Sequence, residues 1–448
     1  MRITLPEPKR FSKVFKTVTN TSFVKIVTGI STDSRQCIEG DLYIAIKGKN
    51  VDGHQFIQKA KDAGAVAALI VKSDEVINDM QQIVVEGTVK IIGEIANAWR
   101  KQFNVPIIGI TGSNGKTTTK DLVKHILDSH YKVHATKGNY NTSIGVPLTL
   151  LQMQGNHNFS IIEMGANQPG DIKTLCQIIE PTDGLITNIA PAHLEGFGSI
   201  DKIAKEKSEL FTHLTNGTAF INITDDWIST FTTNTKSKTY GCTTGCDFSA
   251  DYYRESDGNI ILIINANEIN TNSQNIVFTK NILAASAIAN SFGIDWNTIQ
   301  ERVLSFTPTY GRSVISKYDK ITVIDDTYNA NYNSTLAAIE HLALYPIKGR
   351  RIFIFGDMAE LSNSSKKYHQ KIGEKCVENN LDAVFTVGTQ TVITDNVLDT
   401  LKFHKHYKTR EQLSKKLINF MQNDDIILFK GSRSMGMEKI IQEVFKKK

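Results

Sequence analysis

The sequence is poor in cysteine, in long apolar stretches and in blocks of like charge. Only five of its 448 residues are cysteine, and they are scattered, so we expect free thiols in a reducing compartment. No run approaches the roughly eighteen apolar residues of a membrane-spanning helix, and the first ten residues contain no apolar signal core. No Lys/Arg block is long enough to indicate nucleic-acid binding. We therefore expect a cytoplasmic enzyme without membrane insertion or nucleic-acid partners.

The remaining composition is that of an ordinary globular protein. Hydrophobic residues make up 40% of the chain and charged residues 22%, which suits a protein of this length with two or three domains and an ample core. The net charge of +5 is a weak basic bias. Such a bias fits small anionic substrates.

A glycine-rich segment carries the strongest functional signal. The apolar stretch 105–110 leads into Thr-Gly-Ser-Asn-Gly-Lys-Thr-Thr, and a helical pattern follows, so we predict a strand, a tight loop and a helix. Backbone N–H groups of such a loop can face phosphates, Lys116 can reach the outer ones, and the Thr117 hydroxyl can hold Mg²⁺. Ile110 stands where the usual phosphate-binding motif has its first glycine. A glycine-rich turn with a surface lysine is the alternative, but the flanking strand and helix favour nucleotide binding. The expected nucleotide contacts are Thr111, Gly112, Ser113, Asn114, Gly115, Lys116, Thr117 and Thr118.

Alternating strand and helix patterns predict an α/β protein of three modules. We place these modules at residues 1–103, 104–310 and 311–448, with a parallel sheet and right-handed crossovers in the second and strand–helix alternation again in the third. Residues 224–275 are polar and predict peripheral hairpins of little functional weight. The expected strands are 41–46, 65–71, 106–110, 131–135, 159–163, 184–188, 218–223, 321–325, 351–355, 383–387 and 426–429. The expected helices are 54–63, 89–103, 201–211, 281–292 and 296–306.

Loops that follow parallel strands meet at one edge of a sheet, where ligands bind. Glu163 ends such a strand and could complete Mg²⁺ coordination with Thr117, although a helix cap is the alternative. His193 also follows a strand, but a lone histidine is more often structural. Lys207 lies on a predicted helix and, taken alone, would be a solvated lysine.

The motifs of the central module resemble those of the Mur ligases of peptidoglycan synthesis. The central motifs are Thr-Gly-Ser-Asn-Gly-Lys-Thr-Thr (111–118), Gly-Asn-Tyr-Asn-Thr-Ser-Ile-Gly-Val-Pro (138–147), Glu-Met-Gly-Ala-Asn (163–167) and Ala-His-Leu-Glu-Gly-Phe-Gly (192–198). The C-terminal Asp-Asp-Thr-Tyr-Asn-Ala-Asn (325–331), Gly-Asp-Met-Ala-Glu-Leu (356–361) and Lys-Gly-Ser-Arg-Ser-Met (430–435) resemble the member that adds D-alanyl-D-alanine to UDP-N-acetylmuramoyl-tripeptide. Seven ordered motifs make the resemblance specific, and it implies a three-domain fold with a central P-loop-type parallel sheet and a C-terminal Rossmann-like domain.

The resemblance also implies a reaction and its participants. The γ-phosphoryl group of ATP passes to the tripeptide carboxylate, and the amine of D-alanyl-D-alanine attacks the acyl phosphate. The implied cofactors are ATP and Mg²⁺, and we expect a monomer. A carboxylate and a triphosphate repel each other, so Lys116 and Mg²⁺ must neutralise charge before transfer.

Matched position by position, the resemblance assigns further residues. The implied catalytic residues are Lys116, Lys207, His193 and Asp326. The implied metal ligands are Thr117, Glu163, His193 and Lys207, the last as a carbamate, since an ammonium cannot ligate a cation. Asn281 and Arg312 are implied nucleotide contacts. The expected substrate contacts are Ser34, Arg35, Lys47, Asn139, Asn141, Thr142, Asn329 and Asn331.

One segment departs from the family pattern, and two other functions stay open. The family usually has His or Tyr followed by Asn before the helix at 281–292, where this chain has Val277 and Phe278. A sister ligase that adds the third peptide residue, or a folylpolyglutamate-synthase-like ligase, would share the loop and metal residues. A nucleotide-dependent binding module without ligase chemistry is the alternative from another class.

Overall fold

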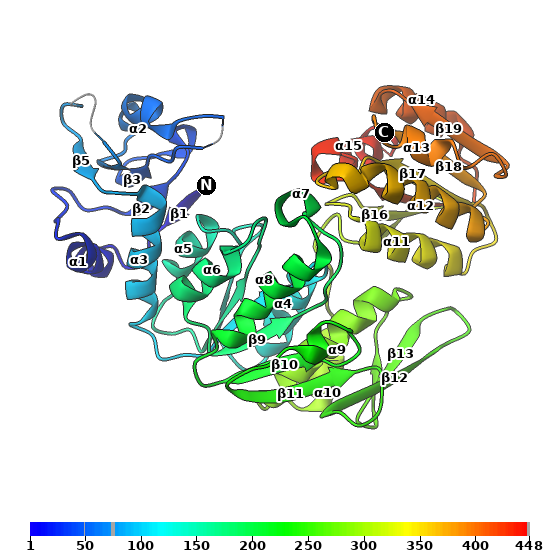
Figure 1. Ribbon diagram of the computed structural model, residues 1–448, viewed down its shortest axis with the longest axis horizontal. Helices are drawn as coiled ribbons and strands as arrows, with labels where there is room; N and C mark the ends of the chain where they lie inside the picture. The colour runs from blue at the N-terminus through cyan, green and yellow to red at the C-terminus, as the bar shows by residue number, and fades with distance from the viewer. Residues whose placement is uncertain (49, 73–76, 446–448) are drawn as a thin grey trace.

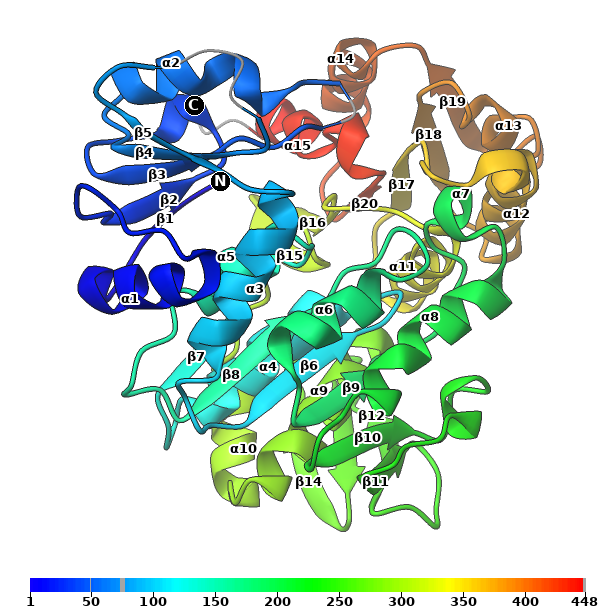
Figure 2. The ribbon, with the colours of Figure 1, turned by 60° about the vertical axis from the view of Figure 1, so that its left-hand side comes forward.

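Three α/β parts follow one another along the chain, each built on its own sheet (Figures 1 and 2). The computed structural model describes residues 1–48, 50–72 and 77–445. In these ranges no helix has the length and apolar character needed to cross a membrane, and all five cysteines are free.

The N-terminal part contains a five-stranded sheet in the order β1-β2-β3-β4-β5. Its strands are β1 (Arg2–Thr4), β2 (Gly29–Ser31), β3 (Asp41–Ile44), β4 (Ala67–Ile70) and β5 (Gln81–Val84), and its helices are α1 (Pro8–Thr19), α2 (Ile57–Asp62) and α3 (Thr88–Arg100). Only β1 runs antiparallel to its neighbour. Helix α1 buries Phe11, Val14 and Phe15, a spacing that places all three on one helical face.

The central part is organised around strand β6. Its sheet has the order β14-β13-β12-β11-β10-β9-β6-β8-β7, with strands β6 (Ile107–Thr111), β7 (Val133–Ala135), β8 (Phe159–Glu163), β9 (Asp183–Ile186), β10 (Thr218–Asn222), β11 (Lys236–Gly241), β12 (Phe248–Arg254), β13 (Ile260–Ile264) and β14 (Asn267–Asn270). Strand β6 pairs in parallel with β8 on one side and β9 on the other. The chain thus leaves β6 in one direction and later returns on its other side, which makes the end of β6 a switch point where ligands bind.

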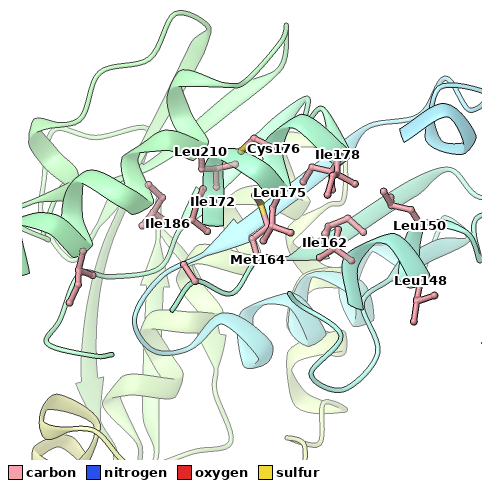
Figure 3. Close-up of a cluster of buried hydrophobic side chains, with 14 of the residues drawn as sticks. Leu148, Leu150, Ile162, Met164, Ile172, Leu175, Cys176, Ile178, Ile186 and Leu210 are labelled. Atoms are coloured by element: carbon pink, nitrogen blue, oxygen red, sulfur yellow. The ribbon is translucent and has the colours of Figure 1, made fainter. Parts of the chain in front are cut away.

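Helices cover the central sheet and support the loops at its edge. They are α4 (Lys116–Leu127), α5 (Gly145–Leu150), α6 (Asp171–Ile179), α7 (Leu194–Phe197), α8 (Ile200–Thr212), α9 (Ile276–Ser291) and α10 (Trp296–Leu304). Figure 3 shows apolar side chains of α5, β8, α6, β9 and α8 meeting in one cluster. Met164, directly after β8, is fully buried in this cluster. This packing fixes the end of β8, and with it the neighbouring Glu163.

The C-terminal part has a six-stranded sheet in the order β15-β16-β20-β17-β18-β19. Its strands are β15 (Val314–Tyr318), β16 (Ile321–Asp326), β17 (Arg351–Gly356), β18 (Ala383–Val387), β19 (Phe403–Tyr407) and β20 (Ile426–Lys430), and its helices are α11 (Tyr332–Leu344), α12 (Ser365–Glu378), α13 (Val392–Asp395), α14 (Arg410–Phe420) and α15 (Glu438–Val444). All pairs except β15–β16 are parallel. The ends of β16, β17 and β20 therefore share one edge.

Two predictions about the central part were wrong. Residues 224–275 are not only peripheral hairpins, because β11 pairs in parallel with β10, and β12 with β11, extending the main sheet. Helix α9 begins at Ile276, five residues before the predicted start, because the Asn275 side chain accepts bonds from the backbone N–H of Val277 and Phe278 and caps the helix. The sequence analysis also missed the elements β1, β2, β5, α1, β15 and β19. The five strands are short or lie at or near sheet edges, where apolar periodicity is weak.

Candidate active site

The loop between β6 and α4 requires glycine at two positions. Gly112 has φ +143° and Gly115 has φ +79°, a region that glycine occupies without steric cost. A Cβ on Gly112 would lie 1.8 Å from Thr187 Oγ1, and one on Gly115 would lie 2.6 Å from Asn281 Oδ1. The turn ends at the N-terminus of α4, whose free N–H groups attract anions.

The loop after β9 holds this glycine-rich loop in place. Ser113 N donates to Asn188 O at 2.9 Å, and Ser113 Oγ donates to Ala190 O at 2.8 Å. Asn114 N donates to Asn188 Oδ1 at 3.0 Å. Because β6 and β9 are adjacent parallel strands, the two loops form one rigid edge.

Lys116 is the cation at the mouth of the loop. Its ammonium donates to Gly112 O at 2.6 Å and to Ser113 O at 3.4 Å. Burial lowers the pKa of Lys116, the carboxylate of Glu163 opposes this shift, and the nearby cation Arg312 adds to it. A bound phosphate would give this charge the partner that the loop carbonyls only partly supply.

Glu163 joins two neighbouring loops through its carboxylate. Thr117 Oγ1 donates to Glu163 Oε2 at 2.7 Å, and Asn141 Nδ2 donates to Glu163 Oε1 at 2.8 Å. Glu163 is only 2% exposed. Among the described residues no three His, Cys, Asp or Glu side chains form a metal cluster. The hydroxyl and carboxylate nevertheless fit Mg²⁺, which uses few protein ligands and takes the others from phosphate and water.

His193 lies on the central part and faces the C-terminal part. It has φ +53° and immediately precedes α7, which projects toward the C-terminal part in Figure 1. Its Nδ1 lies 2.5 Å from Glu360 Oε2, and this contact lowers the pKa of the Glu360 carboxyl. His193 thus belongs to a contact between two of the three parts.

Lys207 is a buried lysine on α8 without a close counter-ion. It is 2% exposed, and no described residue forms a hydrogen bond or close ion pair with its ammonium. Burial lowers its pKa well below the ordinary lysine range, Lys116 adds to the shift, and Glu206 opposes it. Such a lysine favours the neutral amine, the form that reacts with carbon dioxide.

Asp326 forms a buried ion pair at the end of β16. Lys430, which is 2% exposed at the end of β20, donates to Asp326 Oδ2 at 2.6 Å and to Asn329 O at 3.0 Å. Ser313 N donates to the other oxygen, Oδ1, at 3.1 Å. The carboxylate therefore holds the linker from the central part.

The C-terminal part touches the glycine-rich loop directly. Asn331 caps α11 by accepting from Ser334 N at 3.0 Å, and its Nδ2 donates to Asn114 Oδ1 at 2.6 Å. Arg312 lies over the ring of Tyr328, 4.0 Å from its centroid. These contacts bring the hinge-side loop of 325–331 to the glycine-rich loop.

Asn281 lies beside the nucleotide loop on α9. Thr119 Oγ1 donates to its Oδ1 at 3.3 Å. Val277 and Phe278, the two residues that depart from the family pattern, also line the cavity, and Phe278 stacks on Phe306 with ring centroids 5.9 Å apart. The structure thus places apolar groups where the family pattern has polar ones.

The substrate contacts expected in the N-terminal part lie away from this cavity. Arg35 is exposed, and its guanidinium donates to Asp33 Oδ1 at 2.9 Å and Oδ2 at 2.8 Å. This pairing lowers the pKa of Asp33 to about 2. Ser34 is buried and Lys47 is exposed. Arg35 is thus partly neutralised by its neighbour, which weakens its attraction for a phosphate.

One cavity of about 910 Å³ unites most of the expected site. It is lined by Ser113, Asn114, Gly115, Lys116, Thr117, Thr118, Asn139, Asn141, Thr142, Glu163, His193, Asn281, Arg312, Asp326, Asn329 and Asn331. The expected site residues outside its lining are Thr111, Gly112, Lys207, Ser34, Arg35 and Lys47. Thr111 instead donates its hydroxyl proton to Met164 O at 2.9 Å, so its side chain supports the sheet edge.

Several cavity residues were not foreseen as site residues. Lys430 and Tyr328 line the cavity, as do Tyr240 and Cys242 on the added strand β11 and its exit. A lysine directly after the apolar run 426–429 was the available signal for Lys430. Tyr240 and Cys242 had no such signal, because they lie in or just after a strand that only its pairing with β10 brings to this edge.

Comparisons with known proteins agree with this geometry. Residues 26–108 match the catalytic domain of the Mur ligase family, residues 110–289 the Mur ligase middle domain, and residues 311–433 the glutamate ligase domain of Mur ligases. The UDP-N-acetylmuramoyl-tripeptide–D-alanyl-D-alanine ligase of Synechocystis is 35% identical, over 95% of this chain and 94% of its own.

Two solved structures extend the similarity to the whole fold. MurF from Acinetobacter baumannii superposes with a TM-score of 0.88 at 28% identity, covering 97% of this chain and 98% of its own. MurF ligase from Thermotoga maritima, solved with ADP, has a TM-score of 0.79 at 28% identity and covers 93% and 97%.

Proposed function

The chain belongs to the Mur ligase family, and we propose that it joins D-alanyl-D-alanine to UDP-N-acetylmuramoyl-tripeptide with conversion of ATP to ADP and phosphate. The supporting observation is the shared cavity, where the glycine-rich loop faces residues of the C-terminal part. We further propose that the enzyme works in the cytoplasm as a monomer, with domains at 1–103, 104–310 and 311–448.

The protein's own residues prepare the first step. The tripeptide carboxylate and the γ-phosphoryl group of ATP are both anions, so their approach must be offset by positive charge. Lys116 and the N-terminus of α4 supply that charge from the loop, and Arg312 supplies it from the C-terminal side. The carboxylate then attacks the γ-phosphorus, the bond to the β-phosphate oxygen breaks, and ADP leaves with the bond's electron pair.

Magnesium fits this site as a second source of positive charge. We propose that Thr117 and Glu163 hold one Mg²⁺ ion, and that His193 and a carbamylated Lys207 help to hold a second. When bound, Mg²⁺ would neutralise phosphate oxygens and keep them aligned for transfer. The carbamate hypothesis is tested by ¹³C NMR after exposure to labelled bicarbonate, where a new carbamate resonance absent from Lys207→Met supports it.

The second step needs the amine near the acyl phosphate and water excluded. The free amine of D-alanyl-D-alanine attacks the acyl carbon, and the tetrahedral intermediate expels phosphate as the amide forms. We propose that Asn329 and Asn331 bind the dipeptide from the C-terminal part, while Asn139, Asn141 and Thr142 align the peptide of the nucleotide substrate. Ser34, Arg35 and Lys47 would hold the UDP group at the N-terminal part. Contacts between parts, such as Asn331 with Asn114, keep solvent from the intermediate.

Amine choice decides between this function and its closest alternative. The experiment measures ADP release in two reactions. The first contains UDP-N-acetylmuramoyl-tripeptide and D-alanyl-D-alanine. The second contains the corresponding dipeptide nucleotide and a diamino acid. We expect turnover with D-alanyl-D-alanine only. Turnover with the diamino acid alone would refute the assignment, and phosphate release without any amine would indicate a module that lacks ligase chemistry. Tripeptides ending in lysine or meso-diaminopimelate, compared side by side, identify the preferred third residue.

A further inference from the structure

Arg312 is a cation of the cavity that has no polar partner. It lines the cavity together with Lys116. No described residue accepts a hydrogen bond from the Arg312 guanidinium or forms an ion pair with it, although its Nε is buried. Because buried N–H donors in proteins are normally paired, we expect the acceptor of this guanidinium to come from a ligand.

The ring of Tyr328 contacts this guanidinium. Arg312 Cζ lies over the ring, 4.0 Å from its centroid, an arrangement in which a guanidinium and an aromatic face attract each other. Arg433 Cζ lies 5.9 Å from the same centroid, but its Nη1 pairs with Glu438 Oε1 at 3.2 Å. Of the two guanidiniums near this ring, the one of Arg312 is therefore the one whose charge stays unpaired.

The kind of partner decides how much of a guanidinium is left for a ligand. Arg35 in the N-terminal part has a carboxylate partner, because its Nε and one terminal nitrogen donate to Asp33. Such a pairing occupies donors and offsets the charge. An aromatic ring contacts only the face of a guanidinium and leaves its in-plane N–H donors and its charge available. Tyr328 can thus orient Arg312 without weakening its attraction for a phosphate.

Tyr328 is held by hydrogen bonds on both of its sides along the chain. On the preceding side, Thr327 N and Oγ1 donate to Asp325 Oδ1 at 3.1 and 2.6 Å. On the following side, Lys430 Nζ donates to Asn329 O at 3.0 Å. The backbone that carries the ring is therefore anchored to the ends of β16 and β20.

The linker that carries Arg312 is bound to the same loop. Tyr328 N donates to Gly311 O at 3.0 Å, and Ser313 N donates to Asp326 Oδ1 at 3.1 Å. Gly311 has φ +75°, and a Cβ there would lie 3.1 Å from Tyr328 N. The residues on either side of Arg312 are thus fixed to the segment that carries the ring.

We propose that Tyr328 is a positioning residue, whose ring holds the Arg312 guanidinium ready for the phosphates of ATP while leaving its charge and N–H donors free. The proposal rests on the function proposed above, because it takes Arg312 as a source of positive charge for phosphoryl transfer. A fixed backbone still leaves a long arginine side chain several rotamers, and ordering them costs conformational entropy. The ring reduces that cost before the nucleotide binds.

A second arginine–aromatic pair in the C-terminal part provides the control. Arg350 Cζ lies 4.3 Å from the ring centroid of Phe420, against 4.0 Å for Arg312 and Tyr328. Both rings are partly buried, but neither Arg350 nor Phe420 lines the cavity. Phe420→Leu therefore removes a similar contact away from the cavity.

The first measurement uses the full-length protein without substrates. Because Arg312 Nε is buried, its N–H exchanges slowly with water and gives a signal in ¹⁵N-arginine-labelled protein, assigned by its loss in Arg312→Gln. A proton that lies over an aromatic ring resonates upfield. We expect an upfield signal in the wild type, Tyr328→Phe and Phe420→Leu, and a downfield shift in Tyr328→Leu and Tyr328→Gln. Two variants without the ring, each checked by its melting temperature, keep the test valid if one of them fails to fold.

The second measurement is the rate of ADP release at saturating substrates. We expect kcat of Tyr328→Leu to fall about 10-fold, equivalent to about 1.4 kcal/mol, which is within the range of cation–π contacts removed from water. The KM for the UDP-tripeptide should stay nearly unchanged, because the ring acts on the cation that faces ATP. Tyr328→Phe keeps the aromatic face and should recover most of the loss, while Phe420→Leu should keep the kcat of the wild type.

A double-mutant cycle shows whether Tyr328 acts through Arg312. Arg312→Gln removes the charge, and adding Tyr328→Leu to it should lower kcat by less than about twofold more, because the ring then has no guanidinium to hold. If Tyr328 contacts the nucleotide itself or only stabilises the fold, the two losses will multiply, and the positioning role is overturned.

The outcomes distinguish this proposal from the proposed function. If the wild type adds no D-alanyl-D-alanine, the proposed function fails, whereas the ligand-free NMR still reports whether the ring orients the guanidinium. If the wild type is active but Tyr328→Leu keeps either its upfield Arg312 signal or its kcat, the positioning role is overturned. An equal loss of kcat in Tyr328→Leu and Phe420→Leu would also overturn it.

Discussion

Glu163→Gln tests the charge at the end of β8 while leaving its shape almost unchanged. The Glu163 carboxylate accepts from Thr117 Oγ1 and from Asn141 Nδ2. A glutamine can keep both bonds, because its oxygen accepts from Asn141 and its amide group donates to the rotatable Thr117 hydroxyl. The substitution therefore removes the negative charge and little else.

The expected effect on catalysis is much larger than the effect on stability. Exchanging charged for neutral hydrogen bonds at this buried position costs about 1 kcal/mol of unfolding free energy. In catalysis, removing one group that organises charge in the transition state typically costs roughly 3–4 kcal/mol. At about 1.4 kcal/mol per factor of ten, kcat should fall by roughly 10²–10³-fold.

The assay follows ADP release at saturating substrates over a range of Mg²⁺ concentrations, with urea unfolding of each variant as the stability measurement. Asp183→Asn is the control. Asp183 is 5% exposed at the opposite end of the same sheet, and its carboxylate accepts from Thr218 N and Thr182 Oγ1. We expect this control to lose about the same stability but to keep kcat within about threefold.

The reasoning would be refuted by a Glu163→Gln enzyme whose kcat stays within about threefold of the wild type at every Mg²⁺ concentration. It would equally fail if Asp183→Asn lost as much activity, since buried carboxylates of this sheet would then matter only for folding.

Three further predictions concern other buried or cavity-lining basic side chains. Lys116→Ala should lower kcat by about 10³-fold in the ADP-release assay while the circular dichroism spectrum stays unchanged, because its charge acts on phosphates; near-normal turnover would contradict this. Lys207→Met should abolish ligation yet leave the melting temperature equal or higher, because it removes a buried amine that resists protonation; a lower melting temperature would show that Lys207 stabilises the fold. Burial lowers the pKa of His134 to about 3, so below pH 6.5 the unfolded chain binds a proton that the folded chain does not, and the free energy of unfolding should fall as the pH drops. Between pH 6.5 and pH 4, His134→Gln should lose about 3 kcal/mol less unfolding free energy than the wild type, as measured by urea unfolding. The same pH dependence in both proteins would refute the assignment.

The central sheet edge was largely predictable because its signals are local. The apolar run before the glycine-rich loop predicted β6, and the loop composition predicted the nucleotide site, since each needs only neighbouring residues. Strand β8 begins and ends at the predicted residues, 159 and 163. The start of α9 was missed because an asparagine cap, rather than apolar periodicity, determines where that helix begins.

Parts of the site had no local signal. The polar stretch 236–254 contains few features of a buried strand, and only pairing with β10 makes β11 part of the main sheet. Arg35 is a different case: its sequence suggests an anion contact, while the structure shows Nε and one terminal nitrogen of its guanidinium donating to Asp33.

By itself, the sequence determined the local conformations: which loop needs glycine, which strands are buried, and which motifs end them. Only the tertiary structure decided which of these ends meet. Asn114 and Asn331 are more than two hundred residues apart, yet they are 2.6 Å apart at their amide groups, and the pair of His193 with Glu360 joins two domains in the same way. The physical reason is that backbone preference depends on neighbouring residues, whereas a contact between domains depends on the packing of three separate sheets.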